Sequence, residues 1–225
     1  YAEKKYPDEC CGVLVSAGGV TSFIGCTNIS DYPQSTFAIS PKEYADVEDQ
    51  GEIQAIVHSH VLSSSKPSVA DTVSCNQTGL PWLIVSVPNR SETLFLPNNE
   101  IMPYEGRPFF HQLLDCWSLV VDYYGRELGI EVPNFQRQDN WWIKGQNLYL
   151  DLAEEAGFNI ILNEKPQVND VLIMQVGAEV PNHGAIYLGN KIILHHMSGR
   201  PSCKAVYGGF WEKNTWGFLR HKSLM

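Results

Sequence analysis

Two histidines at the end of an apolar segment are the first side chains that could bind a metal ion. His58 and His60 close the segment EIQAIVHSH, and alternate residues of a strand point to the same side, so both imidazoles face one point. Asp71 follows near the expected start of a helix, where its carboxylate could be a third ligand. Three such ligands suit Zn²⁺ and leave a fourth position for a water nucleophile. Glu9, which precedes another apolar segment, is a candidate general base.

The sequence SVAD offers a simpler explanation for two of the polar residues in this region. Ser68 and Asp71 have the spacing of a capping box, in which the serine is the N-cap and the acid occupies N3. On this alternative, His58 and His60 are ordinary surface residues at the end of a strand. The residue types alone leave both a helix cap and a metal site open.

The complete spacing resembles the signature of the JAMM (MPN⁺) metalloproteases. That signature is a distant glutamate followed by H-[ST]-H-x7-S-x2-D, and HSHVLSSSKPSVAD meets every position, while YPDECCGVL resembles the glutamate-bearing segment. The resemblance covers residues 1–98 and implies a zinc domain that cuts amide and isopeptide bonds. It implies that His58, His60 and Asp71 bind the metal. It also implies that Glu9 activates the water and that Ser68 helps to stabilise the oxyanion.

A cysteine at a helix start is the candidate nucleophile of a second site. Cys116 follows Asp115 where an amphipathic helix is expected, because apolar residues recur on one face over residues 113–128. Backbone N–H groups and the helix dipole at such a position favour the thiolate, which is the nucleophilic form of cysteine. The alternative is an unreactive cysteine buried in a helix.

Three histidines near the C-terminus provide candidates for the base that Cys116 needs. His183 begins one expected strand and His195 lies near the end of the next, with a turn expected at Gly189-Asn190. In an antiparallel hairpin the two rings can approach each other, so His183 could act as base with His195 orienting it. His196 competes for the orienting role, although alternation places it on the opposite face of the strand. The alternative is that these histidines simply face solvent.

Two longer segments resemble the motifs of the NlpC-type cysteine peptidases, a papain-like family that cleaves peptidoglycan stem peptides. They are DCWSLVVDYY and VNDVLIMQVGAEVPNHGAIYLGNKIILHHMS, and the resemblance covers residues 108–225. It implies that Cys116 is the nucleophile, His183 the base and His195 the third, orienting residue. Asn169 stands where the family usually has glycine, which we expect to affect a turn rather than the chemistry.

The elements that must position these residues fall into two blocks. In the first block, a helix is expected to start with Ser68 as its N-cap, and short β-branched segments predict buried strands over 12–15, 53–57 and 82–87. A segment rich in proline follows, and within it residues 99–107 are expected to form a linker.

The second block begins with helices and ends with strands. The pattern predicts helices over 113–128 and 140–157, then strands over 168–176, 183–188 and 191–197. This order is typical of an α+β domain. We therefore predict an α+β chain in which a JAMM-like α/β zinc domain over 1–98 precedes a papain-like NlpC-type α+β domain over 108–225.

Composition limits the classes of partner. The chain has 225 residues, a net charge of −9 and a pI of about 5.2, without a basic stripe, so nucleic acid is not an expected partner. No run of about 18 apolar residues occurs, so we expect no membrane span. No signal peptide is apparent at the start of the sequence.

The order of the two domains resembles that of the tail-tip assembly proteins of long-tailed phages, as do HHMSGRPS and WGFLR near the C-terminus. The resemblance implies a virion protein at the tail tip that is made in the host cytoplasm, contacts other tail-tip proteins and digests peptidoglycan locally. One alternative is a structural tail-tip subunit whose peptidase sites are inactive or masked. A second is a deconjugase of ubiquitin-like tags, which the NlpC-type motifs argue against.

Overall fold

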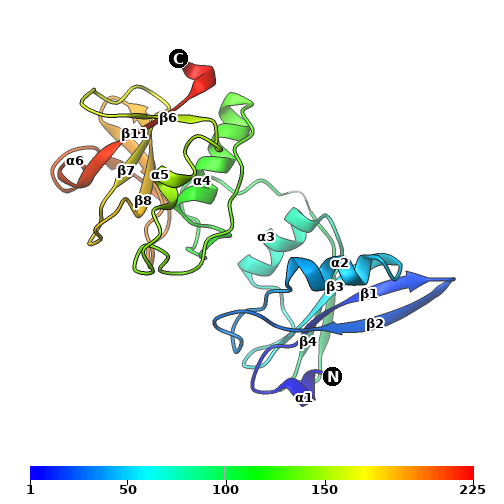
Figure 1. The fold of residues 1–225 in the computed structure, drawn as a ribbon. Coiled ribbons are helices and arrows are strands. Elements are labelled where there is room, and N and C mark those ends of the chain that lie inside the picture. Colours follow the sequence, from blue (N-terminus) through cyan, green and yellow to red (C-terminus); the bar gives the residue numbers. More distant parts are fainter. Residues whose placement is uncertain (99) are drawn as a thin grey trace. The chain divides into compact units, whose positions relative to one another are not determined.

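A computed structural model describes residues 1–98 and 100–225 of the chain (Figure 1). The chain divides into two compact units, Tyr1–Glu100 and Ile101–Met225. Each unit contains a β-sheet and short helices, so the predicted α+β class is confirmed. Residue 99, at which the expected linker begins, lies outside the described residues. Residues 101–107 belong to the second unit, where the guanidinium of buried Arg107 pairs with the Asp122 carboxylate.

The N-terminal unit is a five-stranded sheet with two helices packed on one face. The strand order is β2-β1-β3-β4-β5, in which β3 and β4 are parallel and the other neighbours are antiparallel. Val47 of α2 and Cys75 of α3 pack with Val13 and Trp82 of the sheet in one apolar core. The bounds are α1 Ala2–Lys5, β1 Cys11–Ala17, β2 Val20–Cys26, α2 Pro41–Glu48, β3 Glu52–His60, α3 Val69–Thr78, β4 Trp82–Ser86 and β5 Glu92–Phe95.

Local sequence accounts for the elements around the two histidines. Strand β3 is central in the sheet, and its apolar half is buried up to His60. Helix α3 connects the parallel strands β3 and β4, as such a pair requires. Ser68 is its N-cap, and Gly79 ends it in the left-handed conformation with φ 66°. The predicted helix start and the strands over 12–15 and 53–57 are confirmed, and the third strand ends one residue early, at Ser86.

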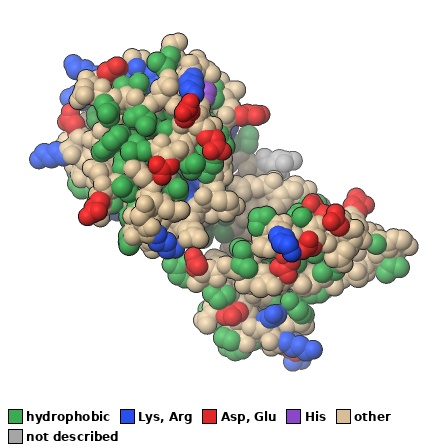
Figure 2. Space-filling view, in the orientation of Figure 1, with side chains coloured by type: hydrophobic (Ala, Val, Ile, Leu, Met, Phe, Trp, Pro, Cys, Tyr) green, Lys and Arg blue, Asp and Glu red, His purple; other side chains and the backbone are tan. Residues whose placement is uncertain are grey.

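The C-terminal unit is a six-stranded antiparallel sheet with α4 packed against it. The strand order is β10-β9-β8-β7-β11-β6. Leu119, Val120 and Tyr124 of the helical segment pack on Ile173 and Ile186 of the sheet. Acidic and basic side chains are interspersed over the visible face of this unit (Figure 2). The bounds are α4 Cys116–Tyr123 with a π-helical continuation Tyr124–Leu128, α5 Leu148–Asp151, β6 Phe158–Ile161, β7 Val171–Met174, β8 His183–Gly189, β9 Ile192–His195, β10 Cys203–Val206, α6 Phe210–Asn214, β11 Thr215–His221 and the 3₁₀ turn Lys222–Leu224.

Two sequence predictions in this unit need correction. The prediction of one helix over 140–157 is wrong, because only α5 within this range is helical. Asn140 and Gly145 have φ values of 54° and 80°, which do not occur in a right-handed α-helix. The hairpin turn lies one residue later than predicted, at Asn190 and Lys191, which both have positive φ as a type I′ turn requires. Asn169 has φ 73°, so an asparagine fills a left-handed turn position there.

A buried ion pair should contribute strongly to the stability of this unit. Arg220 donates from Nε and Nη2 to the two carboxylate oxygens of Asp170, at 2.9 Å each, and both side chains are buried. Removing one partner leaves an uncompensated buried charge, so Arg220→Gln should lower the free energy of unfolding by about 3–5 kcal/mol. Urea titration measures this loss, and Asp170→Asn combined with Arg220→Gln should recover part of it. A loss below about 1 kcal/mol in the single variant would contradict the assignment.

Candidate functional site

Cys116 is the first residue of α4, as predicted, and its backbone is fixed by a capping box. The Asp115 carboxylate accepts hydrogen bonds from the N–H groups of Trp117 and Ser118, at 3.1 and 2.9 Å. The Ser118 hydroxyl in turn accepts from the Asp115 N–H at 2.7 Å. These bonds satisfy the N–H groups of Asp115, Trp117 and Ser118 and fix the backbone on either side of the cysteine.

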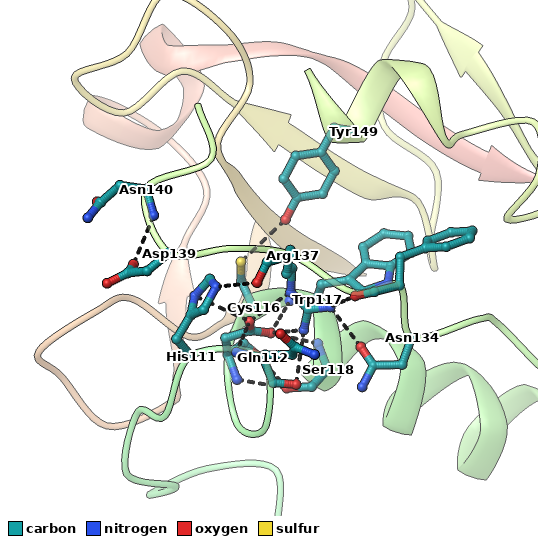
Figure 3. Close-up of polar contacts among 12 residues, drawn as sticks. His111, Gln112, Cys116, Trp117, Ser118, Asn134, Arg137, Asp139, Asn140 and Tyr149 are labelled. Atoms are coloured by element: carbon teal, nitrogen blue, oxygen red, sulfur yellow. Dashed lines mark hydrogen bonds and ion pairs between the residues drawn. The ribbon is translucent and has the colours of Figure 1, made fainter. Parts of the chain in front are cut away.

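The sulfur of Cys116 has a hydroxyl neighbour that the sequence did not predict. Tyr149 Oη lies 3.3 Å from Sγ, and its ring points at the sulfur from α5 (Figure 3). Burial raises the pKa of the Cys116 thiol and the Asp115 charge raises it further, while hydrogen bonds from Tyr149 and the Gly184 backbone lower it. The net pKa lies above the ordinary value, so the resting group is a thiol. The thiolate expected from the helix start alone is therefore outweighed by burial.

His183 and His195 meet as the hairpin prediction requires. His183 Nε2 and His195 Nδ1 are 3.3 Å apart, and both rings are buried. Nε2 of His183 faces His195, so Nδ1 is the ring nitrogen left to accept the proton of Cys116. The backbone of Gly184, which follows His183 in β8, forms a hydrogen bond with the Cys116 sulfur. Trp211 packs on the His195 ring with centroids 4.4 Å apart, which holds the pair in place.

His196 is also buried but occupies a different position. Its ring packs edge-on against Phe109, with ring centroids 5.2 Å apart. Among the described residues, the hydrogen bond of His183 Nε2 goes to His195 and none joins His183 to His196. The structure therefore brings His195, not His196, to His183.

Cys116 and His183 line one cavity of about 360 Å³. Its walls are mainly aromatic and aliphatic, and polar side chains such as Asn182 and Ser198 also line it. Such a cavity can hold an extended peptide group against the thiol. The apolar lining comes from Phe109, Trp117, Phe135, Trp141, Trp142, Leu148, Tyr149, Leu152, Ala153, Val176 and Met197.

The histidine pair should make this unit sensitive to acid. Burial is the main cause that lowers the pKa of His183 to about 3 and that of His195 to about 4, from an ordinary 6.5. Below pH 6.5 these histidines bind protons in the unfolded chain but not in the folded chain. Stability should therefore fall from pH 6.5 to about 4 through His195 and on to about 3 through His183.

Tryptophan fluorescence can measure this loss in urea. Five of the six tryptophans lie in Ile101–Met225, and a Trp82→Phe background removes the sixth. His195→Gln should flatten the pH dependence because it removes one titrating ring, while His183, His196 and His221, whose pKa values burial also lowers, remain. A urea midpoint that stays constant between pH 7 and 4 would refute the prediction.

The three predicted metal ligands of the N-terminal unit converge. His58 Nε2 lies 3.2 Å from Asp71 Oδ1 and His60 Nε2 lies 3.3 Å from Asp71 Oδ2. All three residues are buried, and their candidate ligand atoms lie within 4.8 Å of one another. Two imidazoles and a carboxylate on one point are a donor set that fits a zinc ion.

The capping-box alternative and the converging ligands are both present in the structure. Asp71 Oδ2 accepts from the Ser68 N–H at 2.7 Å, and the Ser68 hydroxyl accepts from the Asp71 N–H at 3.1 Å. The cap therefore fixes the rotamer of Asp71 so that the carboxylate faces the two rings. Ser68 is exposed, and its side chain also forms a hydrogen bond to the Asp71 carboxyl.

Glu9 is buried near the same cluster. Burial raises the pKa of its carboxyl to about 7, and the charge interaction with His60 opposes this shift. A carboxyl with this pKa exchanges protons readily near neutral pH, as a general base must.

Comparison with known proteins identifies the chain. The model of the NlpC/P60 family matches residues 105–220, and that of the prokaryotic homologs of the JAB domain matches residues 1–96. The tail tip assembly protein K of Escherichia phage N15 is 38% identical over 226 residues, with 100% of this chain and 92% of the relative covered. The chain belongs to the tail tip assembly protein K family. The K protein of Escherichia phage lambda is also 38% identical, over 82% of this chain and 90% of its own length.

The resemblance to tail-tip assembly proteins is confirmed, as are an NlpC-type domain in the C-terminal half and a domain related to JAB in the N-terminal half of this K-family chain. Membership of the NlpC/P60 family implies a cysteine-dependent hydrolase in the C-terminal half. A solved NLP/P60-family structure from Staphylococcus aureus is 21% identical, covering 52% of this chain and 37% of that chain with a TM-score of 0.38. Among the described residues, the K-family chain has no helix long and apolar enough to span a membrane.

Proposed function

We propose that the C-terminal domain, residues 108–225, hydrolyses amide bonds in peptidoglycan stem peptides. Cys116 is the nucleophile, His183 the base and His195 the orienting residue. The observation that carries the proposal is the 3.3 Å contact between the two histidine rings beside the cavity that Cys116 and His183 share. The NlpC/P60 match supports the same class of substrate.

The geometry supports attack by a thiol that loses its proton as it reacts. Sγ of Cys116 bonds to the scissile carbonyl carbon while Nδ1 of His183 takes the thiol proton. His195 Nδ1 accepts from the His183 Nε2–H and stabilises the imidazolium that forms. His183 then protonates the leaving amine, which gives a thioester on Cys116. Water hydrolyses that thioester, and His183 accepts a proton from the water and returns it to sulfur.

We infer a second hydrolase site in the N-terminal domain, residues 1–98, which the segment 99–107 links to the first. His58, His60 and Asp71 would hold Zn²⁺, which supplies a Lewis acid when bound. Glu9 takes the proton of the attacking water, and Ser68 donates its hydroxyl proton to the developing oxyanion. The bond would be an amide or isopeptide, in a wall crosslink or in a tail protein.

The names of the relatives support a place in the phage particle. We propose that the protein acts at the tail tip of the virion, contacts other tail-tip proteins during assembly and acts on the host cell wall during penetration. The competing proposal is a structural subunit whose peptidase sites are inactive or masked.

Digestion of purified peptidoglycan tests the enzymatic proposal. The full chain should release fragments with new amine and carboxylate ends within the stem peptide, which mass spectrometry identifies. Chelator should leave this cleavage intact, since Cys116 needs no metal. No cleavage by the chain, free or in purified tails, would favour the structural subunit.

A further inference from the structure

Arg137 is a buried cation next to the proposed nucleophile that the mechanism above does not use. It lies beside the N-terminal turn of α4 in a segment without helix or strand (Figure 3). Its Nε and Nη2 donate to the two carboxylate oxygens of Asp115, at 2.9 and 2.7 Å. Asp115 precedes Cys116, so the guanidinium neutralises the charge closest to the sulfur along the chain.

The guanidinium has no donor left for a ligand. Nη1 donates to Asn134 Oδ1 at 2.8 Å and to the Phe135 carbonyl at 2.6 Å, while Nη2 also donates to the Gln112 carbonyl at 3.2 Å. All five N–H groups are therefore engaged. Arg137 lines the cavity, yet it cannot bind a substrate carboxylate without giving up a bond inside the protein.

These bonds join three separate stretches at the helix start. Gln112 has φ 66°, and its N–H donates to Asp115 Oδ2 at 2.7 Å. The Arg137 carbonyl accepts from His111 Nε2 at 2.9 Å in the matching tautomer. The carboxylate of Asp115 thus receives two backbone N–H groups of the helix, one of the preceding loop and the bidentate guanidinium.

We propose that Arg137 is a positioning residue for the thiol reaction: it offsets the charge of Asp115 and holds the first turn of α4, so that negative charge can develop on the sulfur of Cys116. The inference rests on the proposed role of Cys116 as nucleophile. Without the guanidinium, a buried carboxylate would oppose the thiolate directly. The charge interactions agree, since Asp115 raises the pKa of Cys116 and Arg137 lowers it.

Six titratable groups besides Arg137 face this turn or line the cavity beside it, and each must be considered in the test. Tyr149 contacts the sulfur, and His111 Nδ1 lies 3.9 Å from Asp115 Oδ2. The same cavity is lined by His183, His196 and Asp139. Burial raises the pKa of Asp115, but the hydrogen bonds and charge of Arg137 together with the backbone N–H groups of Ser118 and Gln112 outweigh burial and hold the pKa below its ordinary value. Asp115 therefore stays ionised wherever the thiol titrates.

The test is the pH dependence of Cys116 alkylation by iodoacetamide, resolved by mass spectrometry of peptides from the full chain. Arg137→Gln should move the Cys116 midpoint to higher pH by about one unit or more, the shift typical of one close charge. Arg137→Lys should move the midpoint less, since lysine keeps the positive charge but cannot form the bidentate hydrogen bonds to Asp115. Asp115→Asn combined with Arg137→Gln should bring it back toward wild type, because both charges are then absent. Exposed Cys203 in the same digest is the reference.

Arg220→Gln is the matched control, because it breaks another buried bidentate arginine–aspartate pair in the same unit without lining the cavity. It should destabilise the unit and leave the Cys116 midpoint unchanged. An unshifted midpoint in Arg137→Gln, or a double variant as shifted as the single one, would overturn the inference. If Arg137→Gln does not fold, the lysine and double variants decide. A chain that shows the shift but cleaves no peptidoglycan would count against the proposed function alone.

Discussion

Replacing Cys116 with alanine should lower the rate of stem-peptide cleavage by at least about 10³-fold. The sulfur forms the bond to the substrate carbon, and the Tyr149 hydroxyl beside it cannot take over at neutral pH because burial raises its pKa well above 10. The loss should appear in kcat, since the cavity walls that bind the peptide are unchanged. Fragment release measured by mass spectrometry at saturating substrate gives this number.

Two further variants show whether the loss is chemical. His183→Ala should be nearly as inactive as Cys116→Ala, and the double variant no worse, because the two groups act in one step. Cys26→Ala, in the core of the other unit, should keep cleavage and so controls for the general loss of a thiol. Cleavage by Cys116→Ala at the wild-type rate would place the activity elsewhere in the chain.

The second large effect is expected in the N-terminal unit, where wild-type chain should bind about one zinc ion and His58→Ala with His60→Ala should bind none. Removing both imidazoles leaves a single carboxylate, too few ligands for a zinc site. Zinc at about 1,000 times its dissociation constant should add about 4 kcal/mol to the stability of the unit. Thermal unfolding with zinc and with chelator measures that gain, and metal analysis gives the stoichiometry.

A histidine outside the cluster supplies the matched control. His111→Ala should keep the zinc and its stabilising effect, because His111 belongs to the other unit. Equal zinc content in wild type and the double-histidine variant would show that the metal binds elsewhere. Absence of zinc from both would mean that His58, His60 and Asp71 are not a metal site. Asp71 would then serve only in the cap of α3, beside two buried histidine rings.

The sequence predicted best what depends on short-range spacing. His58 and His60 lie two positions apart in one strand, so their side chains point to the same side of the sheet. Ser68 and Asp71 lie within one helical turn of each other. The hairpin that brings His183 to His195 is also local, and a turn misplaced by one residue did not change which rings meet.

The missing parts of the site come from segments whose path depends on tertiary packing. Tyr149 lies in a region where apolar periodicity predicted one long helix, but Asn140 and Gly145 adopt left-handed conformations and aromatic rings pack on the cavity instead. Arg137 lies in an irregular stretch, and no local pattern pairs it with Asp115. The raised pKa of Cys116 follows from burial, which a helix-start argument does not include.

The most direct test of the central claim is to trap the thioester. Wild-type chain would be mixed with a soluble stem peptide, quenched in acid within the first turnover and weighed intact by mass spectrometry. We expect an added mass equal to the acyl half of the peptide, carried by the fragment that contains Cys116 and lost in Cys116→Ala. Cleavage that proceeds without any adduct and stops with chelator would contradict it and assign the hydrolysis to the His58–His60–Asp71 site.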